Sequence, residues 1–233
     1  MITPALVYEE PSQNRHDSTL EETAANIGVP HGKAHALSRR PVALLDHALE
    51  EIGEPYDIHL LSLSKGENRA GDYLAVNPMG KVPALKHGDT VITEAAAICA
   101  YLADEFPRAT LNVPIGTPRR GVYLKWLFFG PTCIEAAMID RANPRKEEPR
   151  RAMLGYGDFG TVMDVTAKVV ANGLHLMGEQ FTAADVVVGS TLRWGMMFKL
   201  VPERPEFTAY VARLAARPAL QRAEAKDKEL AAA

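Results

Sequence analysis

The stretch NPMGKVPAL, residues 77–85, is followed by KHGD at 86–89 and by TVITEAAAICAYL at 90–102. Two short apolar runs, Ala84–Leu85 and Val91–Ile92, flank Gly88–Asp89, a pattern that predicts a tight hairpin. The apolar residues after Glu94 recur at helical spacing until Pro107. This part of the chain therefore predicts strand, turn, strand and helix.

The residues before and after the hairpin carry the chemistry. Thr93 is expected to cap the helix, with the Glu94 charge in its first turn. The Val82-Pro83 bond can be cis at little cost, which would turn the Val82 backbone outward to pair with an extended, peptide-like ligand. Together with Lys81 and the helix N-terminus, these groups suit a small zwitterionic peptide. A plain turn with a solvated lysine and a dipole-matched glutamate remains the alternative.

This pattern resembles the glutathione-binding half of the cytosolic glutathione transferase family, in particular its bacterial-type, serine-dependent, theta/beta-like members. The resemblance implies that the Val82 backbone before cis-Pro83 pairs with the cysteinyl part of glutathione. It also implies that Lys81 holds the glycyl carboxylate and Glu94 the γ-glutamyl end. The family usually has serine after this glutamate, whereas this chain has Ala95, which leaves only a backbone N–H there. Weaker glutathione binding is the expected consequence.

The preceding segment predicts a strand at Lys33–Leu37, a helix from Pro41 to Ile52 ended by Gly53, and a strand at Tyr56–Leu63. A strand, helix and strand at this spacing form a right-handed βαβ unit. Joined to the hairpin and its helix, they give a thioredoxin-like α/β domain.

Ser38 follows the first of these strands, where the resembling family has its activating residue. A hydroxyl that donates a hydrogen bond to a thiol sulfur favours the thiolate, which is the attacking nucleophile. Ser38 is thus the candidate catalytic residue, and a plain helix cap is the alternative role for it. Tyr8 is a rival because some branches of the family use a tyrosine, but no βαβ connection of suitable length follows it.

From about residue 114 the pattern is helical throughout. A helix at Arg119–Phe129 is interrupted by Gly130-Pro131 and resumes at Cys133–Arg141, and another is expected at Asp158–Ala171. Phe181-Thr182-Ala-Ala-Asp185-Val186 predicts a capping box and a hydrophobic staple, and it resembles the signature of the family's helical domain. The final helix is expected at Pro205–Arg217, with an exposed or frayed tail after it. Five large apolar residues are pocket candidates for a hydrophobic second substrate, although such residues more often form core: Trp126, Phe129, Met196, Met197 and Phe198.

Composition limits the partners, the location and the metal content that can be expected of the protein. A net charge of −3 gives no reason to expect nucleic acid or an anionic membrane surface as a partner. No apolar run approaches the roughly 20 residues of a membrane span, and the N-terminus lacks a signal-peptide pattern, so we expect a cytoplasmic protein. Cys99 and Cys133 are interpreted as small buried thiols. His31 and His35 do not form a convincing metal site, so no metal is expected.

The sequence thus predicts an N-terminal extension (1–32), a thioredoxin-like glutathione-binding domain (33–107) and an all-helical domain (114–225). The resemblance implies a glutathione transferase that uses glutathione as co-substrate in detoxification. It also implies a small hydrophobic electrophile as second substrate and a homodimer. Two alternatives stay open. One is a different glutathione-dependent reaction, namely that of a peroxidase, dehalogenase, ether-cleaving lyase or isomerase. The other is a transferase-like binding module without turnover.

Overall fold

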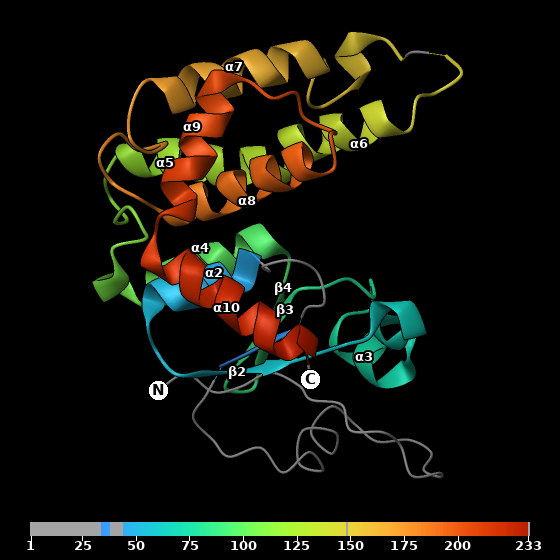
Figure 1. The fold of residues 1–233 in the computed structure, drawn as a ribbon, viewed down its shortest axis with the longest axis vertical. Helices are drawn as coiled ribbons and strands as arrows, with labels where there is room; N and C mark the ends of the chain where they lie inside the picture. Colours follow the sequence, from blue (N-terminus) through green and yellow to red (C-terminus); the bar gives the residue numbers. More distant parts are fainter. Residues whose placement is uncertain (1–33, 38–43, 148, 233) are drawn as a thin grey trace. The chain divides into compact units, whose positions relative to one another are not determined.

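The computed structural model describes residues 34–37, 44–147 and 149–232. The chain divides into two compact units, one reaching from the N-terminal part to Ile98 and including the segment from Arg222 onward, the other comprising Cys99–Gln221. Figure 1 shows the order of the helices and strands along the chain. Tyr8, the expected N-terminal extension and Ser38 lie outside the described residues.

The first unit is built on a four-stranded sheet of β1 (Ala34–Leu37), β2 (Tyr56–His59), β3 (Ala84–His87) and β4 (Thr90–Thr93). The strand order is β2-β1-β3-β4, with β1 parallel to β2 and the other neighbours antiparallel. The predicted hairpin and the thioredoxin-like order are confirmed. The second strand is shorter than the predicted Tyr56–Leu63, because His59 already pairs with Leu37, the last residue of β1.

Helices complete this unit. Helix α2 (Leu44–Ile52) buries Leu45 and Leu49 completely and ends at Gly53, whose φ of 77° is readily adopted by glycine alone. The start predicted at Pro41 lies outside the described residues. Helix α3 (Gly71–Val76), preceded by two short 3₁₀ turns, was not predicted. Helix α4 (Ala95–Glu105) follows the hairpin as expected, and the division between the two units falls within it.

The second unit is helical. Helix α5 (Arg119–Phe129) passes through a π-helical turn at Gly130–Glu135 into α6 (Ala136–Ala142), which confirms the interruption predicted at Gly130-Pro131. The other helices are α7 (Phe159–Ala171), α8 (Ala183–Met197) and α9 (Pro205–Ala215). A Cβ at Gly189 would lie 2.1 Å from the Leu214 side chain, so glycine lets α8 and α9 approach closely.

By length and composition alone, the continuous run Arg119–Ala142 would be long and apolar enough to cross a membrane. In the structure, however, this run buries Tyr123, Leu127 and Ile134 completely within the helical unit. A core helix of a globular domain passes the same test, so we interpret the run as a packed helix.

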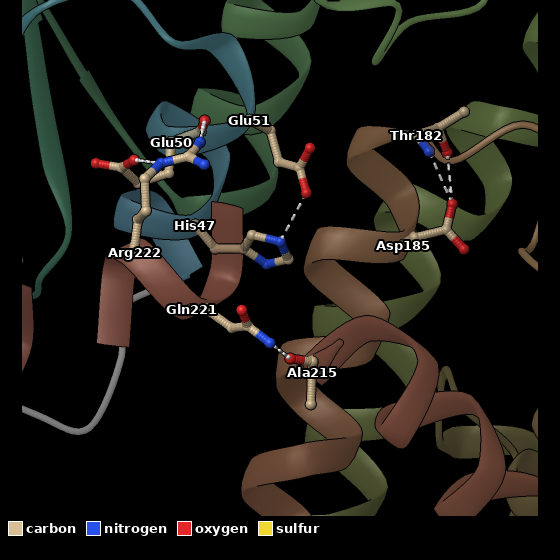
Figure 2. A network of polar contacts seen from close by, with 8 residues as sticks. All are labelled: His47, Glu50, Glu51, Thr182, Asp185, Ala215, Gln221 and Arg222. Atoms are coloured by element: carbon tan, nitrogen blue, oxygen red, sulfur yellow. Dashed lines mark hydrogen bonds and ion pairs between the residues drawn. The ribbon is translucent and has the colours of Figure 1, made fainter. Parts of the chain in front are cut away.

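The capping box at the start of α8 is confirmed (Figure 2). The fully buried carboxylate of Asp185 accepts hydrogen bonds from the Thr182 N–H at 2.9 Å, the Leu176 N–H at 2.8 Å and the Tyr210 hydroxyl at 2.8 Å. The Thr182 hydroxyl adds a fourth at 3.1 Å. Burial raises the pKa of Asp185, and these donors offset part of the rise. One carboxylate therefore joins α8, α9 and the loop before α8.

The tail predicted to be exposed or frayed is helical, and only part of it is exposed. Residues Pro218–Ala232 form helix α10, in which Ala219, Leu220 and Ala223 are buried. The segment is strongly polar, which is why its sequence does not indicate packing. Ion pairs also join α10 to Glu50 of α2, a residue 172 positions away from Arg222.

We predict that Asp185→Asn destabilises the protein by roughly 3 kcal/mol, because the buried donors around this position lose an acceptor. Urea unfolding followed by circular dichroism measures this change. Asp164→Asn is the matched control: the Asp164 side chain is 72% exposed and pairs with Arg204, so its loss should cost less than about 1 kcal/mol. Equal losses in the two variants would contradict a central role for Asp185.

Candidate functional site

The site begins with the turn between α3 and β3. The Asn77 carbonyl accepts a hydrogen bond from the Gly80 N–H at 2.8 Å, and its side-chain oxygen accepts one from the Met79 N–H at 3.1 Å. Asn77 is buried, so both bonds are shielded from water. Asparagine here closes a local turn with its own side chain, as expected of an Asn-Pro-x-Gly sequence.

Gly80 lets this turn lie directly against the preceding 3₁₀ segment. Its φ is +59°, and a Cβ at this position would lie 2.7 Å from the Asn68 carbonyl oxygen. The Asn68 side chain donates to the Gly80 carbonyl at 2.8 Å, and Arg69 donates to the Met79 carbonyl at 3.2 Å. Glycine is needed here both for the backbone conformation and for the close approach.

The peptide that precedes Val82 is fixed by two donors from the α3 region. The Lys81 carbonyl accepts hydrogen bonds from the Tyr73 hydroxyl and from the Asn77 side-chain amide, the latter at 2.7 Å. Burial raises the pKa of Tyr73 to about 12, so its hydroxyl stays protonated and remains a donor at neutral pH. The Lys81 side chain itself is exposed. The backbone at Lys81–Val82 is thus held while the lysine cation faces solvent.

The Val82-Pro83 bond is cis, as predicted. The Val82 side chain packs against the apolar cluster of Leu61, Tyr73, Val76 and Ala84. Within the part of the chain that the structure describes, neither the N–H nor the C=O of Val82 has a hydrogen-bond partner. A backbone donor and acceptor therefore stand side by side on an anchored residue, as a peptide-like ligand requires.

Glu94 occupies the junction between β4 and α4, and the predicted cap at Thr93 is wrong. Thr93 is the last residue of β4, paired with Ala84. The Glu94 carbonyl accepts the first helical hydrogen bond, from the Ile98 N–H at 2.9 Å. Glu94 adopts φ +68°, unusual for a residue with a side chain, and is exposed. Such conformations often occur at ligand sites.

The hairpin register brings the candidate binding residues together. Because Ala84 pairs with Thr93, the adjoining Pro83 and Glu94 lie at the same end of the hairpin. Ala95 begins α4, and the first N–H groups of a helix have no partner within it. The hairpin register thus brings the segment before Pro83, Glu94 and a helix N-terminus to one end of the sheet, and among the described residues the Val82 backbone is unpaired there.

Strand β1 ends at the same end of the sheet as Pro83 and Glu94. Ala36 pairs with Leu85, so the next residue along β1, Leu37, lies level with Ala84 at the start of β3. Ser38 follows Leu37 in the sequence but is outside the described residues. Its activating role stays a prediction, as does the weighing of Ser38 against Tyr8.

The pocket candidates of the helical unit separate into two groups. Trp126 is buried and meets Phe129 edge-on with 5.2 Å between the ring centroids, so it belongs to the core. Met197 and Phe198, at the end of α8, are about half exposed. Phe198 packs edge-on against Trp194 at 4.8 Å, while Met196 is partly buried.

The remaining reactive groups take little part in this site. Cys99 is fully buried, and burial raises the pKa of its thiol to about 12, which confirms an inert core cysteine. Cys133 is partly buried. Among the described residues, no group of three or more His, Cys, Asp or Glu side chains is arranged to hold a metal ion.

The sequence did not predict that two side chains, those of Tyr73 and Asn77, hold the Lys81 carbonyl. Tyr73 supports the Lys81 carbonyl from eight residues away, and no local pattern indicates that contact. The Asn77-Pro78 sequence indicates a turn, but the Asn77 side chain also reaches the Lys81 carbonyl. An aromatic hydroxyl followed four residues later by Asn-Pro is the available signal, because it places both groups on one face of a short helix.

A thioredoxin-like unit with a cis-proline edge, joined to a helical unit with a buried capping box, defines the cytosolic glutathione transferase class. Family models agree: residues 45–105 match the glutathione S-transferase N-terminal domain, and residues 158–218 match its C-terminal domain. The chain belongs to the glutathione S-transferase family.

Individual relatives support this assignment. The chain is 31% identical over 176 residues to glutathione S-transferase GstA of Escherichia coli O157:H7, covering 74% of this chain and 87% of that protein. A glutathione transferase structure from Methylococcus capsulatus superposes with a TM-score of 0.68 at 31% identity, covering 84% and 98% of the two chains. The ternary complex of BphK, a bacterial transferase, superposes with a TM-score of 0.70 at 26% identity, covering 83% and 99%.

We predict that Gly80→Ala destabilises the protein more than Gly88→Ala does. Both glycines have φ near +60°, but a Cβ at Gly88 meets nothing within 4 Å. Gly88→Ala should cost about 1 kcal/mol for the backbone conformation, and Gly80→Ala about 2 kcal/mol more for the clash with Asn68. Chemical denaturation of both variants measures the difference. Indistinguishable losses would show that the turn is not tightly packed.

Proposed function

We propose that the first unit binds glutathione along the edge formed by Lys81, Val82 and Glu94. The hairpin register that collects these groups at one end of the sheet is the observation that carries the proposal. The Val82 backbone pairs with the cysteinyl part and Lys81 attracts the glycyl carboxylate. Glu94 receives the γ-glutamyl ammonium, and the Ala95 N–H meets its carboxylate. Structures of related transferases that hold glutathione support this assignment of ligand.

We propose that Ser38 activates the bound thiol. Its hydroxyl donates a hydrogen bond to the sulfur, which stabilises the thiolate and releases the thiol proton to solvent. The thiolate attacks an electrophilic carbon of a small hydrophobic substrate. A carbon–sulfur bond forms, and the leaving group departs with its electron pair. The helical domain, residues 114–225, supplies the second-substrate pocket, whereas residues 33–107 bind glutathione. The working form is a cytoplasmic homodimer.

The ultraviolet absorbance of the thiolate, followed across pH with glutathione bound, tests the activation. We expect the bound thiol to titrate well below about 8.5, and Ser38→Ala to return it towards that value with binding changed only a few-fold. Tyr8→Phe should leave the titration unchanged, and Thr90→Ala, a hydroxyl removed at the far end of the hairpin, is the control.

The outcomes of this titration separate the alternatives. An unshifted thiol in the wild type would overturn activation and favour a binding module. A shift that is lost in Tyr8→Phe would move the role to Tyr8. Where activation holds, product analysis with candidate electrophiles, peroxides and halides distinguishes transfer from the other glutathione-dependent reactions.

Calorimetric titration with glutathione tests the binding edge. Glu94→Gln should weaken binding by about tenfold or more, roughly 1.4 kcal/mol, because the ammonium of the ligand loses its counter-charge. Ala95→Ser should tighten binding a few-fold by supplying the hydroxyl that the family usually has there. Glu105→Gln is the control: it removes a charge from the exposed end of the same helix and should leave the affinity for glutathione unchanged. Unaltered affinity in Glu94→Gln would place the ligand elsewhere.

A further inference from the structure

The Glu50 carboxylate of α2 is bound by side chains of the C-terminal helix. Glu50 accepts hydrogen bonds from Arg222 Nε at 2.6 Å, Lys226 Nζ at 2.5 Å and the Tyr56 hydroxyl at 2.8 Å. Arg222 also donates to the Glu50 backbone carbonyl at 2.8 Å, as Figure 2 shows for the Arg222–Glu50 contacts. Burial acts to raise the pKa of Glu50, but the bonds from Lys226, Arg222 and Tyr56 outweigh it and lower the pKa. Glu50 is therefore charged throughout the neutral range.

A second carboxyl group of α2 lies one turn before Glu50 and is not stabilised in this way. Asp46 is only 1% exposed, and its Oδ1 atom is buried without a hydrogen-bond partner among the described residues. Among the described residues, the charged groups that act on it are Asp227 and Lys226 of α10 and Glu50 of its own helix. Two of these three carry the same charge as an ionised Asp46, so ionisation is opposed by both burial and repulsion.

We propose that the attachment of the C-terminal helix to α2 is a proton-controlled latch. With a proton on Asp46, the neutral carboxyl group does not repel the Asp227 charge, and the Glu50 ion pairs hold the helix. When that proton leaves, the Asp46 carboxylate and the Asp227 charge repel each other, and the helix loosens. The inference is independent of the proposed transferase function, because it concerns residues that take no part in the glutathione edge.

The direction of the pH dependence follows from the environment of Asp46. Burial and the nearby Asp227 charge raise the pKa of Asp46 from its ordinary value near 3.8 to about 7, while Lys226 opposes the rise. A carboxyl group whose pKa is higher in the folded than in the unfolded state binds more protons when folded. Its contribution to stability is complete below about pH 4 and is lost progressively as the pH rises to about 7. The latch therefore weakens between mildly acidic and mildly alkaline conditions.

Hydrogen exchange measured by mass spectrometry on the full chain tests the latch. We expect protection in residues 222–230, corrected for the intrinsic pH dependence of exchange, to fall by up to about tenfold between pH 6 and pH 8. Asp46→Asn should abolish this dependence and keep the helix protected at both values. Asp227→Asn should do the same by removing the repulsion from the other side, which keeps the test decisive if one variant folds poorly.

Two further variants separate the latch from a general effect of charge. Glu229→Gln removes an exposed carboxylate from the same helix and should leave the wild-type pH dependence intact. Glu50→Gln should lower protection of the helix at every pH, because the ion pairs are lost whatever the state of Asp46. Equal protection of the wild type at pH 6 and pH 8 would overturn the proposal, and so would an unchanged pH dependence in both Asp46→Asn and Asp227→Asn.

Discussion

The pairing of Ala84 with Thr93 is the constraint on which the candidate site depends. This pair ends the β3–β4 ladder, so the chain must leave both strands at the same point. On one side it leaves through cis-Pro83 and Val82, and on the other through Glu94 into α4. A slip of one residue would turn the apolar residues of the hairpin to the opposite face. The register that buries Leu85 therefore also brings the Lys81–Pro83 segment and Glu94 to the same end of the hairpin.

The sequence predicts correctly those turns and caps that depend only on residues close together in the chain. Gly80 and Pro83 restrict their own backbone angles, and Thr182 with Asp185 satisfies donors only three residues apart. Helix α3 and α10 were missed because neither is recognisable alone. Helix α3 is short, and its Tyr73 acts with Asn77, the residue after the helix, on a carbonyl further along the chain. Helix α10 is polar, and Glu50, which binds it, precedes Arg222 by 172 residues.

The error at Thr93 shows how a sheet overrides a local preference. Threonine is a good helix cap, but its β-branched side chain suits a strand equally well, and here the Ala84 pairing keeps it in β4. The turn into α4 is then left to Glu94, which adopts a left-handed conformation that threonine tolerates poorly. That shift of one residue moves the carboxylate from the first helical turn to the junction itself, beside the backbone edge at Val82.

Asp185 and Asp46 are both buried carboxyl groups, but their hydrogen-bonding environments are opposite. Asp185 is surrounded by donors from three parts of the helical unit, so its removal breaks contacts in all three. In the part of the chain that the structure describes, one Asp46 oxygen has no hydrogen-bond partner, and the charge of Asp227 opposes its ionisation. Burying a carboxyl group in this second way costs stability unless it is neutral. Neutralisation near pH 7 makes its contribution depend on conditions, whereas the donors around Asp185 make that contact a permanent part of the fold. The same residue type therefore serves as a structural junction in one unit and as a control point in the other.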